Sequence, residues 1–122
     1  MHFNVEPATT NSFGHLIGRF KATPKEQFPQ RWLLLEAAHV VGQTRIRPHL
    51  QVHFLMLGLA LETRVTSEVF GQLFRLVLVP LGHAFGRLPI GNSGRSNVSA
   101  FKPMPPSPEV LQTISESHSE KS

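Results

Sequence analysis

The sequence predicts an all-α protein built from antiparallel helical hairpins. Three observations predict this class: apolar side chains recur at helical spacing, proline and glycine fall where helices begin and end, and strand-like alternation is nearly absent. The chain has 122 residues, of which 40% are hydrophobic and 16% are charged. That length and composition are typical of one folded domain with one hydrophobic core, and not of a disordered chain.

The first two predicted helices are residues 11–22 and a helix that begins at Phe28. Pro29 suits the first turn of a helix, because the N–H that proline lacks would have no helical partner there. Gly42 stands where a helix of this length commonly ends. The segment Thr23–Glu26 also fits a capping box, so the second helix has an alternative, earlier start.

The third predicted helix begins at Pro48 and runs to about Glu62, which leaves only residues 43–47 as a connection. A loop this short makes the two helices antiparallel neighbours. Thr66 is the predicted cap of a fourth helix, which continues until Pro80 ends or kinks it. Helices that begin near residues 11, 29, 48 and 66 are spaced like tetratricopeptide repeats, so we expect a tetratricopeptide (TPR)-like four-helix arrangement.

The rest of the chain is predicted to be irregular. Turn residues occur at Gly91–Gly94, and residues 102–108 are rich in proline. The glycine-rich turn lacks the Gly-Lys-Ser/Thr of a P-loop and follows no strand, so we interpret it as a plain turn and not as an anion site. We expect a flexible N-terminus at 1–10, a single helical domain at 11–108 and a disordered tail at 109–122.

Composition excludes several classes of function. The chain has no cysteine, and therefore no disulfide, no thiolate metal site and no cysteine nucleophile. It has no Gly-x-Ser-x-Gly elbow, so nothing supports serine hydrolase chemistry. We assign no catalytic residue, and we favour a protein that is not an enzyme over one in which the histidines act as acid–base catalysts. The net charge of +4 comes from scattered residues, which argues against nucleic-acid binding. With no signal-peptide pattern and no span of about 20 apolar residues, we expect a bacterial cytoplasmic protein with no membrane segment.

The main candidate site is a group of four residues: Glu36, His39, His49 and His53. Glu36 and His39 are three residues apart, and His49 and His53 are four apart, so each pair shares one helix face. The hairpin places His39 and His49 at the same height beside the loop, and the other two one turn further away. We therefore expect one carboxylate and three imidazoles to converge.

Such a set of ligands suits a divalent transition metal: Zn²⁺, Ni²⁺, Co²⁺ or Fe²⁺. Helical bundles use Glu-x-x-His for metal sites of this kind. The helix dipole favours a neutral His49, whereas His39, near a helix C-terminus, is expected to be protonated more easily. We predict a metal-binding accessory protein.

A second interpretation stays open, because His53 lies on an apolar stripe with Met56, Leu57 and Ala60. The histidines could then form a buried polar network with Glu36 or Gln43, inside a helical module that binds a protein partner or forms a homodimer. Two other histidines are weaker candidates. His15 lies on the less certain first helix, and His83 follows Pro80, where a helix is expected to end or kink.

Several segments resemble, in the same order, a small bacterial family known as domain of unknown function 3703. They are Leu35–Gln43, His49–Leu57, Glu68–Arg75, Gly91–Gly94 and Val98–Pro105, and the resemblance covers about residues 12–108. It implies a fold but no activity. The family pattern has arginine where this chain has Ala37, and Gly-Asn-Thr-Gly-Gly where this chain has Ser93 and Arg95. Neither departure touches the four candidate ligands.

Overall fold

The structure is a computed structural model that describes residues 10–119, with side-chain environments for residues 12–117. It contains five helices: α1 (Thr10–Ala22), α2 (Phe28–Gly42), α3 (Ile46–Thr63), α4 (Thr66–Phe85) and α5 (Pro108–Ser119). No strand occurs within residues 10–119, and the predicted all-α class is confirmed. None of the described helices is long and apolar enough to span a membrane.

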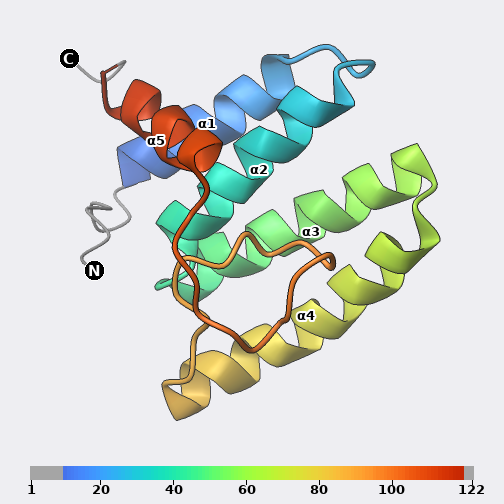
Figure 1. Ribbon diagram of the computed structural model, residues 1–122, viewed down its shortest axis with the longest axis vertical. Coiled ribbons are helices and arrows are strands. Elements are labelled where there is room, and N and C mark those ends of the chain that lie inside the picture. The colour runs from blue at the N-terminus through green and yellow to red at the C-terminus, as the bar shows by residue number, and fades with distance from the viewer. Residues whose placement is uncertain (1–9, 120–122) are drawn as a thin grey trace.

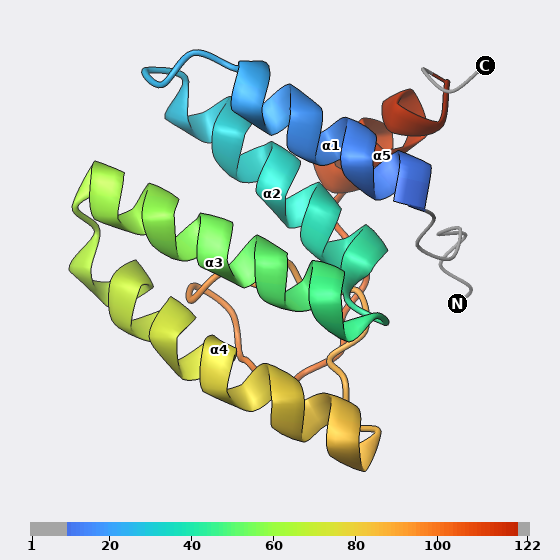
Figure 2. The ribbon, with the colours of Figure 1, turned by 180° about the vertical axis from the view of Figure 1, so that it is seen from behind.

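Helices α1 to α4 form one layer in which each helix packs against the next along the chain. Figure 2 shows the four helices side by side, with the chain reversing at each short connection. The antiparallel hairpins follow from connections too short to lead the chain elsewhere. The likeness to tetratricopeptide stacking stays a prediction.

Helix α2 lies at the centre of the hydrophobic core. It contacts α1 and α5 as well as α3, and ten of its fifteen residues are buried. The largest fully buried apolar side chains come from α1, α2, α3 and α5: Leu16, Leu34, Leu35, Val52, Met56, Leu59 and Val110. Most side chains on α2 are therefore shielded from bulk water. His39 is one of these buried side chains.

Helix α4 continues five residues beyond Pro80, so the expectation that proline could end the helix there was wrong. An internal proline removes one backbone hydrogen bond, and the packing of α4 along α3 maintains the helix past it. The helix ends at Gly86, whose φ of 66° lies in the left-handed region. Its N-cap is Val65, with no side-chain cap, so the predicted cap at Thr66 was also wrong.

Residues 109–119 lie in helix α5, so the prediction of a disordered tail was wrong for this part of the chain. Val110 and Ile114 are four residues apart, and their side chains are 1% and 4% exposed against α1 and α2. The Ser117 hydroxyl donates a hydrogen bond to the Ser12 carbonyl at 3.1 Å. An amphipathic helix can thus form from a mostly polar stretch when a few apolar side chains have helical spacing. The predicted flexibility of 1–10 falls almost wholly outside the described residues, as do 120–122.

Residues 86–107 form an irregular segment, as expected, and it crosses one face of the helical layer before α5 begins (Figure 1). This segment brings Gly91–Gly94 against α2 and α4, where it forms part of the candidate site described below.

We predict that Ile114→Ala lowers the free energy of unfolding by about 2–4 kcal/mol, because it leaves a cavity where α5 packs on the core. Leu111→Ala is the matched control on the same helix, since Leu111 is 40% exposed; its effect should stay within about 0.5 kcal/mol. Urea denaturation followed by circular dichroism measures both values. Equal, small effects would show that α5 contributes nothing to stability.

Candidate metal centre

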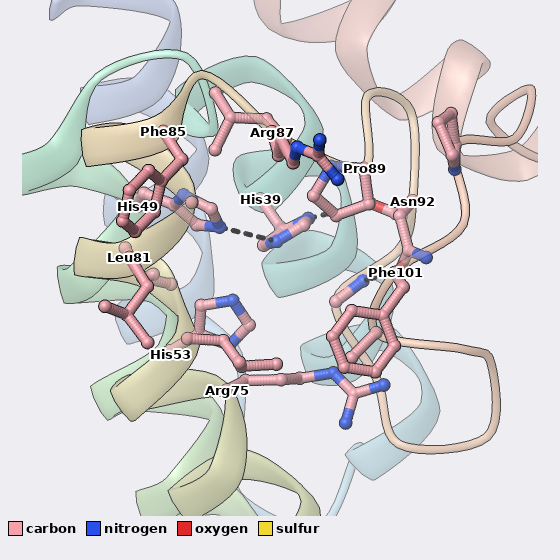
Figure 3. A pocket seen from close by; sticks show the side chains of 17 residues that line it. His39, His49, His53, Arg75, Leu81, Phe85, Arg87, Pro89, Asn92 and Phe101 are labelled. Atoms are coloured by element: carbon pink, nitrogen blue, oxygen red, sulfur yellow. Dashed lines mark hydrogen bonds between the residues drawn. The ribbon is translucent and has the colours of Figure 1, made fainter.

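Three of the four predicted ligands come together in a buried cluster of His39, His49 and His53. Helix α2 supplies His39, and α3 supplies the other two. One ligand nitrogen from each imidazole lies within 4.8 Å of the others, and the side chains are at most 3% exposed. Figure 3 shows the three rings turned toward one another at the wall of a pocket.

The structure does not bring Glu36 to this cluster. Its carboxylate faces Arg95, with Oε2 3.6 Å from Nη1, and Arg95 also lies 4.0 Å over the ring of Trp32. Burial raises the pKa of Glu36, and the charge of Arg95 opposes that rise. A residue three positions before His39 points about 60° to one side of it. On α2 that side faces residues 86–107 and not α3, so the expected fourth ligand was wrong.

The tautomer of His39 is set by the irregular segment. His39 Nδ1 lies 2.7 Å from the carbonyl oxygen of Asn92. A carbonyl only accepts hydrogen bonds, so Nδ1 carries the proton, and in the neutral ring Nε2 carries the lone pair. Metal-binding histidines are commonly oriented in this way, by an outer carbonyl at the other ring nitrogen.

The tautomer of His53 is set by two polar residues of α4. His53 Nδ1 lies 2.7 Å from Gln72 Oε1. The Gln72 amide has a defined orientation, because its Nε2 donates to the Glu68 carboxylate at 2.7 Å and to the Gly94 carbonyl at 2.9 Å. Gln72 Oε1 must therefore accept from His53 Nδ1, and the lone pair of His53 is on Nε2.

His49 contacts a histidine on each side. Its Nε2 lies 3.1 Å from Nε2 of His39, and its Nδ1 lies 3.0 Å from Nε2 of His83 on α4. If His49 donates through Nδ1 to His83, all three clustered histidines present Nε2 lone pairs. If His49 donates through Nε2 instead, it forms a hydrogen bond to His39. The position of His83 was missed because α4 was expected to end or kink at Pro80.

Glu68, Gln72 and Arg75 were also missed by sequence reasoning, although a signal was present. Glu68 and Arg75 are the only acidic or basic residues of the twenty in α4, apart from His83, and both are buried. Spacings of four and three residues place all three on one face. Arg75 donates to the carbonyls of Arg95 and Val98 at 2.9 and 2.6 Å, which fixes the irregular segment against the helix.

The glycine-rich turn packs directly on the histidine cluster. The interpretation of these residues as a plain turn missed this contact. Gly94 has a φ of 85°, and a Cβ there would lie 2.7 Å from Cδ2 of His39. Asn92 is 1% exposed; its amide donates to the carbonyls of Ser99 and Lys102, and its own carbonyl receives His39. The turn therefore positions the imidazole of His39.

Burial lowers the pKa of all three clustered histidines. The pKa of His49 falls to about 3 and that of His53 to about 4, while that of His39 lies well below 6.5. After burial, neighbouring histidines are the next cause for His39 and His49. The rings are neutral at pH 7, the state in which imidazole binds a metal. Burial outweighs the dipole of α2, so the expectation that His39 is easily protonated was wrong.

The cluster opens into a pocket with a volume of about 970 Å³, formed by α4 and the irregular segment. Two nitrogens bound to one tetrahedral metal at ~2.05 Å each lie ~3.3 Å apart. The 3.1 Å between Nε2 of His39 and Nε2 of His49 is close to that separation. Three buried imidazoles whose ligand nitrogens all lie within 4.8 Å of one another are compatible with metal binding.

The family model described as "Protein of unknown function (DUF3703)" matches residues 8–114, so the chain belongs to this family. The resemblance seen in the sequence is confirmed. No curated protein and no solved structure matches the chain. The family description gives no activity.

We predict that the metal-free protein loses stability as the pH falls below 6.5. The folded state holds these histidines neutral, whereas the unfolded chain binds protons near pH 6.5, so stability is complete above that pH and declines below it. Each histidine contributes a slope approaching about 1.4 kcal/mol per pH unit. Urea denaturation between pH 7 and 5.5 measures the slope, and His53→Gln should reduce it. A flat profile would contradict the neutral cluster.

Proposed function

We propose that this DUF3703 protein binds one divalent transition-metal ion on Nε2 of His39, His49 and His53. The observation that carries the proposal is the outer hydrogen bond at Nδ1 of each ring. Asn92 and Gln72 assign the lone pairs of His39 and His53 to their Nε2 atoms. When His49 donates through Nδ1 to His83, three imidazole lone pairs in a neutral, buried cluster form a ligand set for Zn²⁺, Ni²⁺, Co²⁺ or Fe²⁺.

A purely structural network accounts for His53 less well. With Nδ1 donated to Gln72, its Nε2 has no hydrogen-bond partner among the described residues. A lone pair that no side chain or backbone group occupies is available to a metal ion. The ring lies at the pocket, where an ion can reach it (Figure 3).

The outer partners also resemble those of metal sites. Gln72 connects His53 to the Glu68 carboxylate, so a negative charge lies two hydrogen bonds from the ring. Such an arrangement makes the imidazole a stronger ligand. A fourth position open to the pocket suits an accessory protein that takes up an ion and passes it on.

A second candidate function is a helical interaction module, and the outer face of α4 favours it. Phe70, Val77 and Phe85 are 65–73% exposed, and the two acidic or basic residues of this helix are buried. Large exposed apolar patches commonly mark interaction sites. In this alternative the histidines only fix α3, α4 and the irregular segment to one another.

We predict that untagged protein binds one equivalent of Zn²⁺, Ni²⁺ or Co²⁺, and that His49→Ala and His53→Ala each weaken binding at least 100-fold. His15→Ala is the matched control, because His15 lies on α1 away from the cluster. Elemental analysis after reconstitution and titration against a chelating indicator measure stoichiometry and affinity.

Binding also raises the melting temperature, with a gain of about 2.7 kcal/mol at free metal equal to 100 times Kd. Absence of stoichiometric metal, together with a loss of stability in His39→Ala that does not depend on metal, would instead support the interaction module.

We predict that His83→Ala lowers metal affinity about 10–100-fold with unchanged stoichiometry, because His83 orients His49 from outside the metal's own ligand set. Glu36→Gln should leave affinity unchanged, since that carboxylate pairs with Arg95. Absorption spectra of the Co²⁺ form distinguish the roles, because the loss of a direct ligand replaces a nitrogen donor and shifts the ligand-field bands, whereas the loss of an outer group leaves the donor set unchanged. A His83→Ala variant with wild-type affinity would contradict the outer role, and so would loss of all binding.

A further inference from the structure

The pocket above the histidines is much larger than a metal ion requires. Its volume of about 970 Å³ lies at the upper end of the range of small-molecule pockets, roughly 300–1,000 Å³. Its walls are mainly apolar and come from α4 and the irregular segment: Leu78, Leu81, Phe85, Leu88, Phe101 and Pro103. A hydrated ion gains nothing from such walls, whereas an organic molecule does.

Large apolar side chains stand at the pocket and remain open to solvent. Phe85 is 73% exposed, Phe101 is 70% exposed and Leu81 is 49% exposed. Figure 3 shows Phe85 and Phe101 on opposite sides of the pocket, with His39 between them. A ligand with an apolar body would bury these surfaces, and their exposure in the unliganded protein supplies a driving force for binding.

The charges around the pocket all have one sign. Arg75 and Arg87 are among its seventeen lining residues, and none of those seventeen carries a carboxylate. Arg87 is exposed, and its guanidinium forms no ion pair with any described residue. A cleft with apolar walls and the unpaired positive charge of Arg87 attracts anions. A metal dication on the histidines would strengthen that preference.

We infer that this pocket binds a small amphipathic organic anion, a molecule with an apolar body and one acid group. The acid group lies toward Arg87 and the histidines, and the apolar body lies between Phe85 and Phe101. The inference rests on the proposed metal site only for an added anchor on the acid group. The charge of Arg87 and the apolar walls act with or without the ion.

Isothermal titration calorimetry with three probes tests the selectivity. Decanoate has the apolar chain and the acid, decyltrimethylammonium has the same chain with a positive head, and acetate has the acid alone. We expect decanoate to bind with a stoichiometry of one, and the other two to bind at least tenfold more weakly. Titrations of chelator-treated protein and of Zn²⁺-loaded protein separate the contribution of the metal, which should increase decanoate affinity.

Two variants and one control locate the binding. Arg87→Gln should weaken decanoate binding about three- to tenfold, and Ala100→Phe, which fills the pocket from its wall, should weaken it more than tenfold. Arg47→Gln is the matched control, because Arg47 is an exposed arginine outside the pocket and its change should have no effect. Circular dichroism checks that all three variants are folded.

Each outcome bears on the inference separately from the metal proposal. Decanoate binding without any metal binding would overturn the metal site and support the pocket, and metal binding without decanoate binding would do the reverse. Equal affinity for decanoate and decyltrimethylammonium, or binding unchanged in Arg87→Gln and Ala100→Phe, would overturn the inference. A dimer that Phe85→Ser dissociates, with no decanoate binding, would assign this face to a second copy and also overturn it.

Discussion

The hydrogen bond from His39 Nδ1 to the Asn92 carbonyl joins two parts of the molecule that otherwise have different architectures. One part is the helical layer, held by apolar packing around α2. The other is the irregular segment 86–107, which has no regular backbone pairing of its own. Because this bond lies in the interior at 2.7 Å, the segment must sit against the layer for the His39 ring to be satisfied. The tautomer of the ring, the shape of the turn and the wall of the pocket all depend on that contact.

Polar side chains from the helices replace the missing backbone pairing of the segment. Gln43 donates to the Pro89 carbonyl and accepts from the Gly91 N–H. Glu68 accepts from the Ser96 N–H at 2.8 Å, and although burial raises its pKa, the hydrogen bonds from Gln72 and Ser96 outweigh that effect and lower it overall. Buried polar networks of this kind specify one arrangement when every member is satisfied. The segment is thus irregular in conformation but defined in position.

The sequence predicted the helices well because their signals are local. Pro29 and the short connection at 43–47 determine where helices begin and turn, and neither depends on distant contacts. The hairpin also places His39 beside His49 by geometry alone. The prediction at Pro80 was wrong because the sequence shows the cost of the missing backbone hydrogen bond at that position. It does not show the packing of α4 along α3, which offsets that cost.

The rest of the site could not be predicted, because it depends on where the irregular segment folds back. Glu36 has the right spacing to join His39, but its partner is Arg95, and the two are 59 positions apart in the sequence. Asn92 was missed for the same reason. It contacts His39 through its backbone carbonyl, so its side-chain type gives no sign of this role. Helical spacing gives the direction of a side chain, and only the tertiary fold shows what lies in that direction.

The composition of the pocket has a consequence for how it can open. One wall is α4 and the other is the irregular segment, and the bonds that fix the segment are the same ones that orient His39 and Gln72. Local unfolding of the segment would therefore release the pocket wall and the imidazole tautomers in a single cooperative event. The proposed ligand and the proposed ion would both lose contacts in that single event, so their release would be kinetically linked.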